Sequence, residues 1–286
     1  MVAFAGLMCY NRCRTFLILF KPFPVNLSKE HYKMTDEVFL AYTIIFSVFV
    51  FIFGTVIGSF LNVVIYRTPR HESLIRGRSH CTTCGAQIKN RDLIPVISWI
   101  FLGGKCRNCK SRISARYTVV ELLGGALYLL AFLRFRFSLE LIYCFILFPI
   151  LICLSFIDID HMEIPYWCSI SIAVLGLISI FTVNNMPWYE HLIGAAVISV
   201  PFAVLAFLGA MGGGDVQLIA AAGLLLGWGI VPAALVGILT GAVYGVVHKA
   251  VTKNSEMCFG PFLSIGIAVG MLWGQDIIQW YVGLLG

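Results

Sequence analysis

Charged side chains are scarce in this sequence. Lys, Arg, Asp and Glu together make up 12% of its 286 residues, whereas 59% are hydrophobic and the mean hydropathy is +0.91. About a quarter of the residues in an ordinary soluble domain are charged, so the composition excludes that class and indicates a polytopic membrane protein. The apolar segments also lack the apolar–polar alternation that a membrane β-barrel requires.

Long apolar runs take the place of the missing charges. A run of about 20 apolar residues can cross the bilayer as a helix, and a helix satisfies its own backbone polar groups in lipid. We therefore expect an all-α polytopic membrane protein with about eight transmembrane helices, the sixth and seventh short and nearly fused. The expected spans are roughly 39–65, 117–133, 141–157, 167–183, 191–210, 216–228, 229–247 and 261–284.

Positive charge is concentrated in one long hydrophilic loop. Eleven Lys or Arg residues lie from Arg67 to Arg116, against two acidic residues. Such a stretch can bind nucleic acid or anionic lipid, but beside a membrane span the positive-inside rule explains it better. We expect lipid and no nucleic acid at this loop, and we place the loop in the cytoplasm. The connections near 158–166, 211–215 and 248–260 then also face the cytoplasm.

Four of the ten cysteines form two C-x2-C pairs in the basic loop, Cys81 with Cys84 and Cys106 with Cys109. Each pair can offer two thiolates, and two pairs complete a tetrahedral zinc site. The 21 residues between the pairs slightly exceed the usual interval. Disulfides are disfavoured in the reducing cytoplasm. The pattern predicts a structural Zn2+ in a zinc-ribbon-like loop; a redox pair or two disulfides are the alternatives.

Acidic residues near membrane depth are rare and indicate function. Asp158, Asp160 and Glu163 lie between the third and fourth apolar runs, and Asp215 opens the sixth run after three glycines. Charge bias alone places both stretches at the cytoplasmic edge of the membrane. Two facing carboxylates share a proton, so that one can activate water while the other polarises a carbonyl. This is the chemistry of an aspartic peptidase; capping of a helix N-terminus at a wet boundary is the alternative for each aspartate.

Several motifs together resemble the type IV prepilin peptidases, the leader peptidases of pilus and type II secretion systems. The resemblance covers most of residues 54–265. Besides the CxxC loop, it rests on GSFLNVVIYR at 58–67, IPVISW at 94–99, GGKCRNC at 103–109, ISARYTVVELLGG at 113–125, DIDHMEIP at 158–165, GGGD at 212–215 and FGPFL at 259–263. Gln217 and Tyr166 depart from the family pattern, which puts substrate preference in doubt more than the reaction.

The resemblance implies a multi-pass enzyme of the bacterial inner membrane with Asp158 and Asp215 as its catalytic pair. It implies cleavage of the basic leader of prepilins or pseudopilins after a Gly at the cytoplasmic face, with pilus or secretion assembly machinery as further partners. Many members also N-methylate the new N-terminus with S-adenosylmethionine, and the zinc loop favours both activities here. No Gly-rich methyl-donor motif is readable in the sequence.

Substrate binding is expected from residues around the catalytic pair. Gly212, Gly213 and Gly214 would let an extended peptide approach the backbone. Because prepilin leaders are basic, we expect the acidic Asp160 and Glu163 to bind the leader, while the basic loop meets lipid headgroups.

The chain divides into four parts on this reading. Residues 1–33 contain an apolar run too short for a span and no convincing cleavage site, so we expect them to be an upstream extension and Met34 to be the biological start. The first transmembrane helix would occupy 34–65, the cytoplasmic zinc-binding loop 66–116 and the transmembrane catalytic core 117–286.

Three other functions fit parts of the pattern. A presenilin-type intramembrane aspartyl protease also uses GxGD, but its first Asp usually follows Tyr inside a span. An ion-coupled transporter with a structural zinc loop would have broken helices near the midplane and internal repeats, whereas the breaks here lie at the edge. In a membrane assembly factor, the aspartates would only cap helices.

Overall fold

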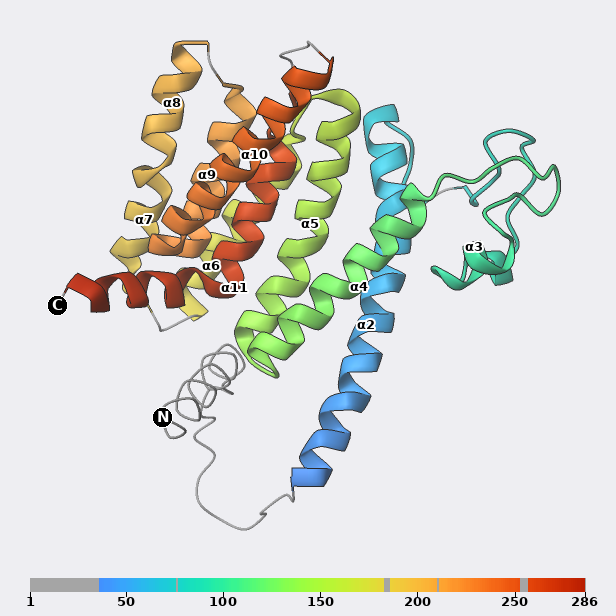
Figure 1. Cartoon of the computed structure of the whole chain (residues 1–286), viewed down its shortest axis with the longest axis horizontal. Helices are drawn as coiled ribbons and strands as arrows, with labels where there is room; N and C mark the ends of the chain where they lie inside the picture. Colours follow the sequence, from blue (N-terminus) through green and yellow to red (C-terminus); the bar gives the residue numbers. More distant parts are fainter. Residues whose placement is uncertain (1–35, 76, 183–185, 210, 253–256, 286) are drawn as a thin grey trace, which may run out of the picture.

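The chain folds as a bundle of helices (Figure 1). The structure is a computed structural model that describes residues 36–75, 77–182, 186–209, 211–252 and 257–285. The predicted extension 1–33 and start Met34 lie outside these residues. The long elements are α2 (Asp36–Arg67), α4 (Arg116–Phe135), α5 (Leu139–His161), α6 (Tyr166–Thr182), α7 (Trp188–Val197), α8 (Ser199–Phe207), α9 (Gly213–Leu226), α10 (Ile230–Thr252) and α11 (Gly260–Leu285).

The helical elements confirm an all-α polytopic membrane protein. Among the described residues, six helical stretches are long and apolar enough to cross a membrane, where we expected about eight. The difference has two sources: α6 has only 17 residues, and α9 and α10 count together as one stretch of 39 residues. The predicted span 191–210 is also interrupted, because α7 ends at Val197 and α8 begins at Ser199.

The α9–α10 stretch is not one straight helix. Between them lies the 3-10 turn η3 (Gly227–Gly229), in which Gly227 has a φ of +56° that side-chain-bearing residues rarely adopt. Gly229 packs against Gly274 of α11, whereas Gly245 of α10 packs against Met257, close to the start of α11. The chain therefore reverses its direction at η3. The sequence analysis placed the boundary between the sixth and seventh spans at the same point, near 228.

Close approach of backbones holds α2 against α4. A Cβ at Gly54 would lie 2.6 Å from the carbonyl oxygen of Gly124, and a Cβ at Gly58 would lie 2.7 Å from Cα of Glu121. Small residues four apart let membrane helices approach in this way and gain van der Waals contacts. This packing fixes the start of α4 beside α2, and with it the base of the intervening loop.

Helix α5 runs through the centre of the bundle. Pro149 lies inside it and cannot donate a backbone hydrogen bond to the carbonyl of Phe145. The hydroxyl of Tyr128 on α4 donates to that carbonyl at 2.6 Å and stacks its ring on Phe145. The buried residues of α5, from Leu141 to Asp158, pack against the surrounding helices. The bundle thereby fixes the position of the helix end that carries Asp158.

Candidate active site and metal centre

Asp158 lies in the last turn of α5 and is buried, with 5% of its surface exposed. Its Oδ2 accepts a hydrogen bond of 2.9 Å from the backbone N–H of Gly260, the first residue of α11. A Cβ at Gly260 would lie 2.7 Å from that oxygen, so the contact requires glycine. Met162, with a φ of +53°, ends α5 and donates its N–H to the carbonyl of Asp158. The FGPFL motif therefore holds one carboxylate in place.

Asp215 lies in the first turn of α9 and is also buried, with 8% exposed. Its carboxylate accepts a hydrogen bond from the backbone of Gly212 and interacts electrostatically with Asp158. A Cβ at Gly214 would lie 3.1 Å from Cβ of Ile164, so the turn between α5 and α6 packs onto the start of α9. The structure thus brings the two predicted aspartates together, with Gly212 and Gly213 exposed beside them.

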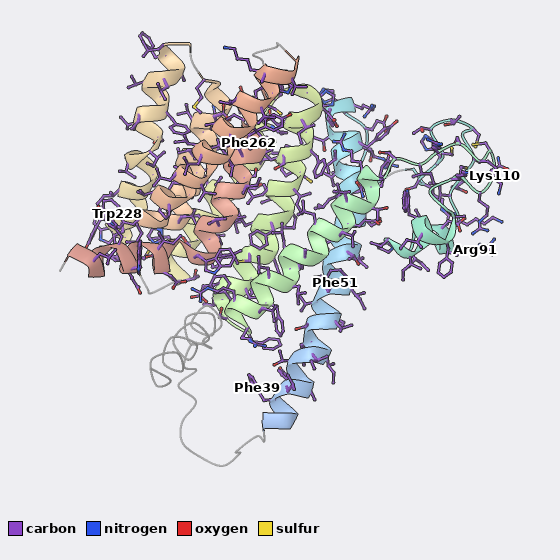
Figure 2. The ribbon with its side chains drawn as sticks, in the orientation of Figure 1. Phe39, Phe51, Arg91, Lys110, Trp228 and Phe262 are labelled. Atoms are coloured by element: carbon purple, nitrogen blue, oxygen red, sulfur yellow. The ribbon has the colours of Figure 1, made fainter. Side chains whose placement is uncertain are left out.

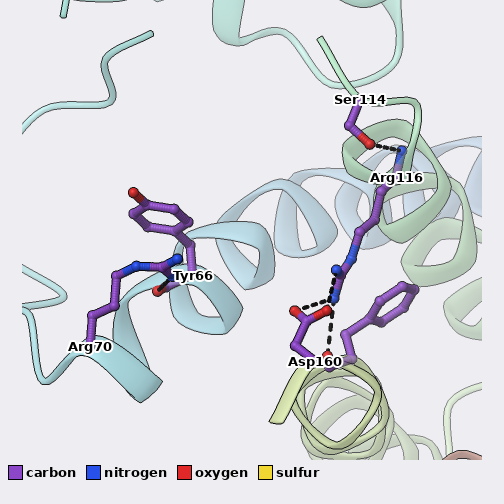
Figure 3. A network of polar contacts seen from close by, with 6 residues as sticks. Tyr66, Arg70, Ser114, Arg116 and Asp160 are labelled. Atoms are coloured by element: carbon purple, nitrogen blue, oxygen red, sulfur yellow. Dashed lines mark hydrogen bonds and ion pairs between the residues drawn. The ribbon is translucent and has the colours of Figure 1, made fainter. Parts of the chain in front are cut away.

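Asp160 has a different environment. Its two carboxylate oxygens accept hydrogen bonds of 2.6 and 2.7 Å from the guanidinium of Arg116, which also donates to the carbonyl of Phe156 at 3.0 Å (Figure 3). Residues two apart on a helix point about 200° apart, so Asp160 faces α4 while Asp158 faces α9 and α11. Glu163 is exposed. Leader binding by Asp160 and Glu163 stays a prediction, and the ion pair already occupies Asp160.

Arg116 is a residue that the sequence analysis missed. It lies between the cysteine loop and α4, and its guanidinium also lies 5.0 Å from the ring centre of Phe156. Its ion pair joins the first residue of α4 to the end of α5. The sequence offers only a weak signal for it, an arginine beside a predicted span, because the partner is distant along the chain.

The four loop cysteines form a cluster that fits a metal ion. The sulfur atoms of Cys81, Cys84, Cys106 and Cys109 all lie within 4.8 Å of one another, and those of Cys81 and Cys109 are 3.9 Å apart. Four sulfurs that bind zinc tetrahedrally at about 2.3 Å are separated by about 3.8 Å. The donor set and its spacing therefore suit Zn2+, with all four positions filled by protein.

Two similar turns build this cluster. In the first, the N–H of Cys81 donates to Ala86, and in the second the N–H of Cys106 donates to Ser111. The residue after each pair, Gly85 or Lys110, has a positive φ of 69° or 62°. Isolated bridges, His80 with Gln87 and Lys105 with Arg112, flank the two turns. The loop is therefore two related halves that each present two thiols to one point.

The surroundings of Cys81 and Cys109 favour the thiolate form that binds metal, whereas the pKa of the Cys84 thiol is raised. Hydrogen bonds from the backbone of Cys84 and Thr83 lower the pKa of the Cys81 thiol to about 6. A hydrogen bond with the Ser111 side chain lowers the pKa of the Cys109 thiol. Beside the cluster, Arg107 makes a bidentate ion pair with Asp92 and holds the pKa of that carboxyl below its usual range. The turns thus prepare ligands for a cation.

Fold and site together define a polytopic membrane protein with a buried aspartate pair at one end of its bundle and a four-cysteine loop. The chain belongs to the type IV leader peptidase family. That family's profile matches residues 145–246, and the profile of the bacterial peptidase A24 N-terminal domain matches residues 52–135. The family match confirms the resemblance and does not favour the presenilin-type or transporter alternatives.

Curated relatives named prepilin leader peptidase/N-methyltransferase are similar over most of the chain. The protein from Bacillus subtilis (strain 168) is 36% identical over 242 residues, which cover 81% of this chain and 96% of the relative. The Legionella pneumophila protein is 34% identical, with 81% and 93% covered. The Myxococcus xanthus protein is 36% identical over 74% of this chain, which spans 65% of that relative's length. No solved structure matches.

Proposed function

We propose that this chain is an aspartic endopeptidase that removes the basic leader of type IV prepilins or pseudopilins by cutting after a Gly. The observation that carries the proposal is the position of Asp158 and Asp215: both are buried, and the turn that follows Asp158 packs onto the start of α9, where Asp215 lies. A helix cap at a wet boundary would not need a second carboxylate from another helix. Membership of the leader peptidase family supports the same activity.

In this mechanism the two carboxylates share one proton. The ionised carboxylate takes a proton from a water molecule, and that water attacks the scissile carbonyl carbon. The protonated carboxylic acid donates a hydrogen bond to the carbonyl oxygen and stabilises its developing charge. The tetrahedral intermediate then collapses with cleavage of the C–N bond, and the carboxyl group that took the proton from water gives it to the leaving amine. The N–H of Gly260 orients Asp158, and the exposed glycines Gly212 and Gly213 leave room for an extended substrate beside Asp215.

A second activity is N-methylation of the new N-terminus. It is supported by the names of the relatives, which combine a leader peptidase with an N-methyltransferase. S-adenosylmethionine would be the methyl donor. The sequence contains no Gly-rich donor motif, so we assign no residues to the donor and derive no methyl-transfer step.

Zinc has a structural role in this proposal. Cys81, Cys84, Cys106 and Cys109 would hold the ion with four sulfur ligands, which leaves no open position for a catalytic water. The ion would supply folding free energy to the loop 66–116, in which no apolar side chain of the described residues is buried. The same proposal divides the chain into a first helix at 34–65, this loop and a catalytic core at 117–286.

The active site would face the cytoplasm of a bacterial inner membrane. Asp158 and Asp215 lie at the end of the bundle from which the cysteine loop projects, and the loop carries the positive charge that marks cytoplasmic segments (Figure 1). Prepilins would be the substrates, and the machinery that assembles pili or secretion pseudopili would receive the product.

The test is cleavage of a prepilin by the full-length protein in membranes. Asp158→Asn and Asp215→Asn should each abolish cleavage, because neither variant can cycle one proton between two carboxylates. His161→Gln is the matched control, since it changes an exposed polar side chain in the same turn at the end of α5, and it should retain cleavage. Normal cleavage by either of the first two variants would disprove the assignment of the pair. Loss in all three would indicate that the turn as a whole had been disturbed.

A further inference from the structure

The cysteine loop carries an exposed apolar surface that zinc binding does not explain. Short helix α3 (Ile97–Phe101) exposes 51% of Ile97, 63% of Ile100 and 86% of Phe101. Positions i, i+3 and i+4 lie on one face of a helix, so the three side chains form one patch. Leu93 and Ile94, just before the helix, are 41% and 47% exposed and extend it. A contiguous apolar patch on an otherwise hydrophilic loop marks a contact surface.

A hydrogen bond ties this patch to a membrane helix. The backbone N–H of Val96, directly before α3, donates to Oε2 of Glu121 on α4 at 2.7 Å. Val96 has a φ of +62°, which costs a β-branched residue energy and needs such a contact to hold it. Figure 1 shows α3 to the right of α2 and α4, lower than the rest of the loop and level with part of α4. The patch therefore lies at the membrane end of the loop.

Cations lie directly behind the patch. A hollow of about 610 Å³ is lined by Trp99, by Gly103 to Lys105 and by Arg112 to Ala115. Lys105 and Arg112 are exposed, and neither forms an ion pair among the described residues. Arg91 is also exposed beside α3 (Figure 2). The surface thus combines an apolar face with neighbouring positive charge.

We propose that α3 and this hollow dock onto the lipid bilayer. Ile97, Ile100 and Phe101 enter the boundary of the acyl chains, as the apolar face of an interfacial helix does. Lys105 and Arg112 contact the phosphate of anionic headgroups. The bilayer is the occupant because α2 and α4 hold both ends of the loop at the membrane, so no diffusing partner has to be captured. The proposal does not depend on the proposed peptidase activity.

Tryptophan fluorescence in vesicles tests the apolar part. Phe101→Trp is placed in the full-length chain, and Lys110→Trp, at the outer edge of the loop in Figure 2, is the control. The vesicles contain phosphatidylcholine and phosphatidylglycerol, with or without bromine near the headgroup end of the acyl chains. After subtraction of the six native tryptophans, we expect bromine to quench about half or more of the emission added at 101 and almost none of that at 110. Ile100→Trp serves as a second reporter.

Equal quenching at positions 101 and 110, or the absence of quenching at both 100 and 101, would overturn the proposal and indicate a protein partner for the patch.

The cations are tested in the Phe101→Trp background. Phosphatidylglycerol should increase quenching relative to phosphatidylcholine alone, and Lys105→Gln with Arg112→Gln should remove about half or more of that increase. Lys110→Gln should leave it unchanged. If phosphatidylglycerol increased the quenching equally with and without the Lys105 and Arg112 substitutions, these two side chains would not contact the headgroups.

Discussion

The aspartate pair and the cysteine centre bring reactive side chains together by opposite means. Asp158 and Asp215 come from two long helices, and their positions depend on the packing of α5, α9 and α11. The cysteines come from two local turns, each closed by its own backbone hydrogen bonds. Apolar packing in the bundle can hold the first site without a ligand. The two turns of the cysteine centre have little apolar surface to bury and need a metal ion to join them.

Apart from substitution of the aspartates themselves, the largest effect expected from breaking one site alone is that of Gly260→Ala. The added Cβ would lie 2.7 Å from Oδ2 of Asp158, so the carboxylate or α11 must move. Displacement of a catalytic group by about 1 Å can reduce the rate by about 100-fold. We expect a loss of that order in prepilin cleavage, with the zinc content unchanged. Gly283→Ala in the same helix, where nothing lies within 4 Å of the added atom, should cleave normally.

Removal of the metal should affect the loop and leave the bundle folded. Cys84→Ser, or treatment with a chelator, removes a ligand or the ion, so the loop loses the interaction that joins its halves. We expect loss of bound zinc and at least about tenfold faster tryptic cleavage between residues 67 and 116. Helix content should change little. Cys153→Ala, at a cysteine buried in α5, should keep the zinc. A bundle that unfolded with the loop would show that the two regions are not independent.

Gly58→Ala tests the packing that fixes the base of the loop. Its Cβ would lie 2.7 Å from Cα of Glu121, and such overpacking usually costs about 1–3 kcal/mol. We expect a lower unfolding temperature in detergent. Val56→Ala, at a half-exposed position of the same helix, is the control and should shift that temperature less. An unchanged midpoint for Gly58→Ala would mean that α2 and α4 are less closely packed than described.

The smallest effect should come from the ion pair between Arg116 and Asp160. Its side chains are 37% and 34% exposed, so solvent screens the interaction. A double-mutant cycle with Arg116→Gln and Asp160→Asn should give a coupling of about 0.5–1 kcal/mol in the free energy of unfolding. A coupling above that range would mean that the pair also organises the turn that carries Asp158.

The sequence predicted both sites better than their surroundings. The cysteine spacing predicted the metal cluster because its ligands lie on short local turns. Charge bias predicted that Asp158 and Asp215 lie at the same membrane edge, and the family resemblance favoured Asp158 over Asp160 as the catalytic residue. The burial of Asp158 and the pairing of Asp160 with Arg116 are consistent with that choice.

Other features could not be read from the sequence because they depend on contacts between distant segments. The bond from Val96 to Glu121 and the ion pair of Arg116 join residues on different elements. The break between α7 and α8 did have a signal that the sequence analysis missed, Pro201 in the first turn of α8, which cannot donate a hydrogen bond to the carbonyl of Val197. Hydropathy averages alone merge α9 and α10, although the sequence analysis did place their boundary near 228, where η3 lies.

Each carboxylate of the candidate site lies next to the N-terminus of a helix, and the two helices are different. Asp215 is in the first turn of α9, and Asp158 accepts the first N–H of α11. A helix N-terminus acts as roughly half a positive charge and a C-terminus as roughly half a negative charge. The starts of α9 and α11, offset by the end of α5 that carries Asp158, therefore leave about half a positive charge at the site. A pair of carboxylates that shares one proton carries one negative charge. Backbone dipoles can therefore offset part of that negative charge, whereas a buried lysine or arginine would compete for the same oxygens as the substrate.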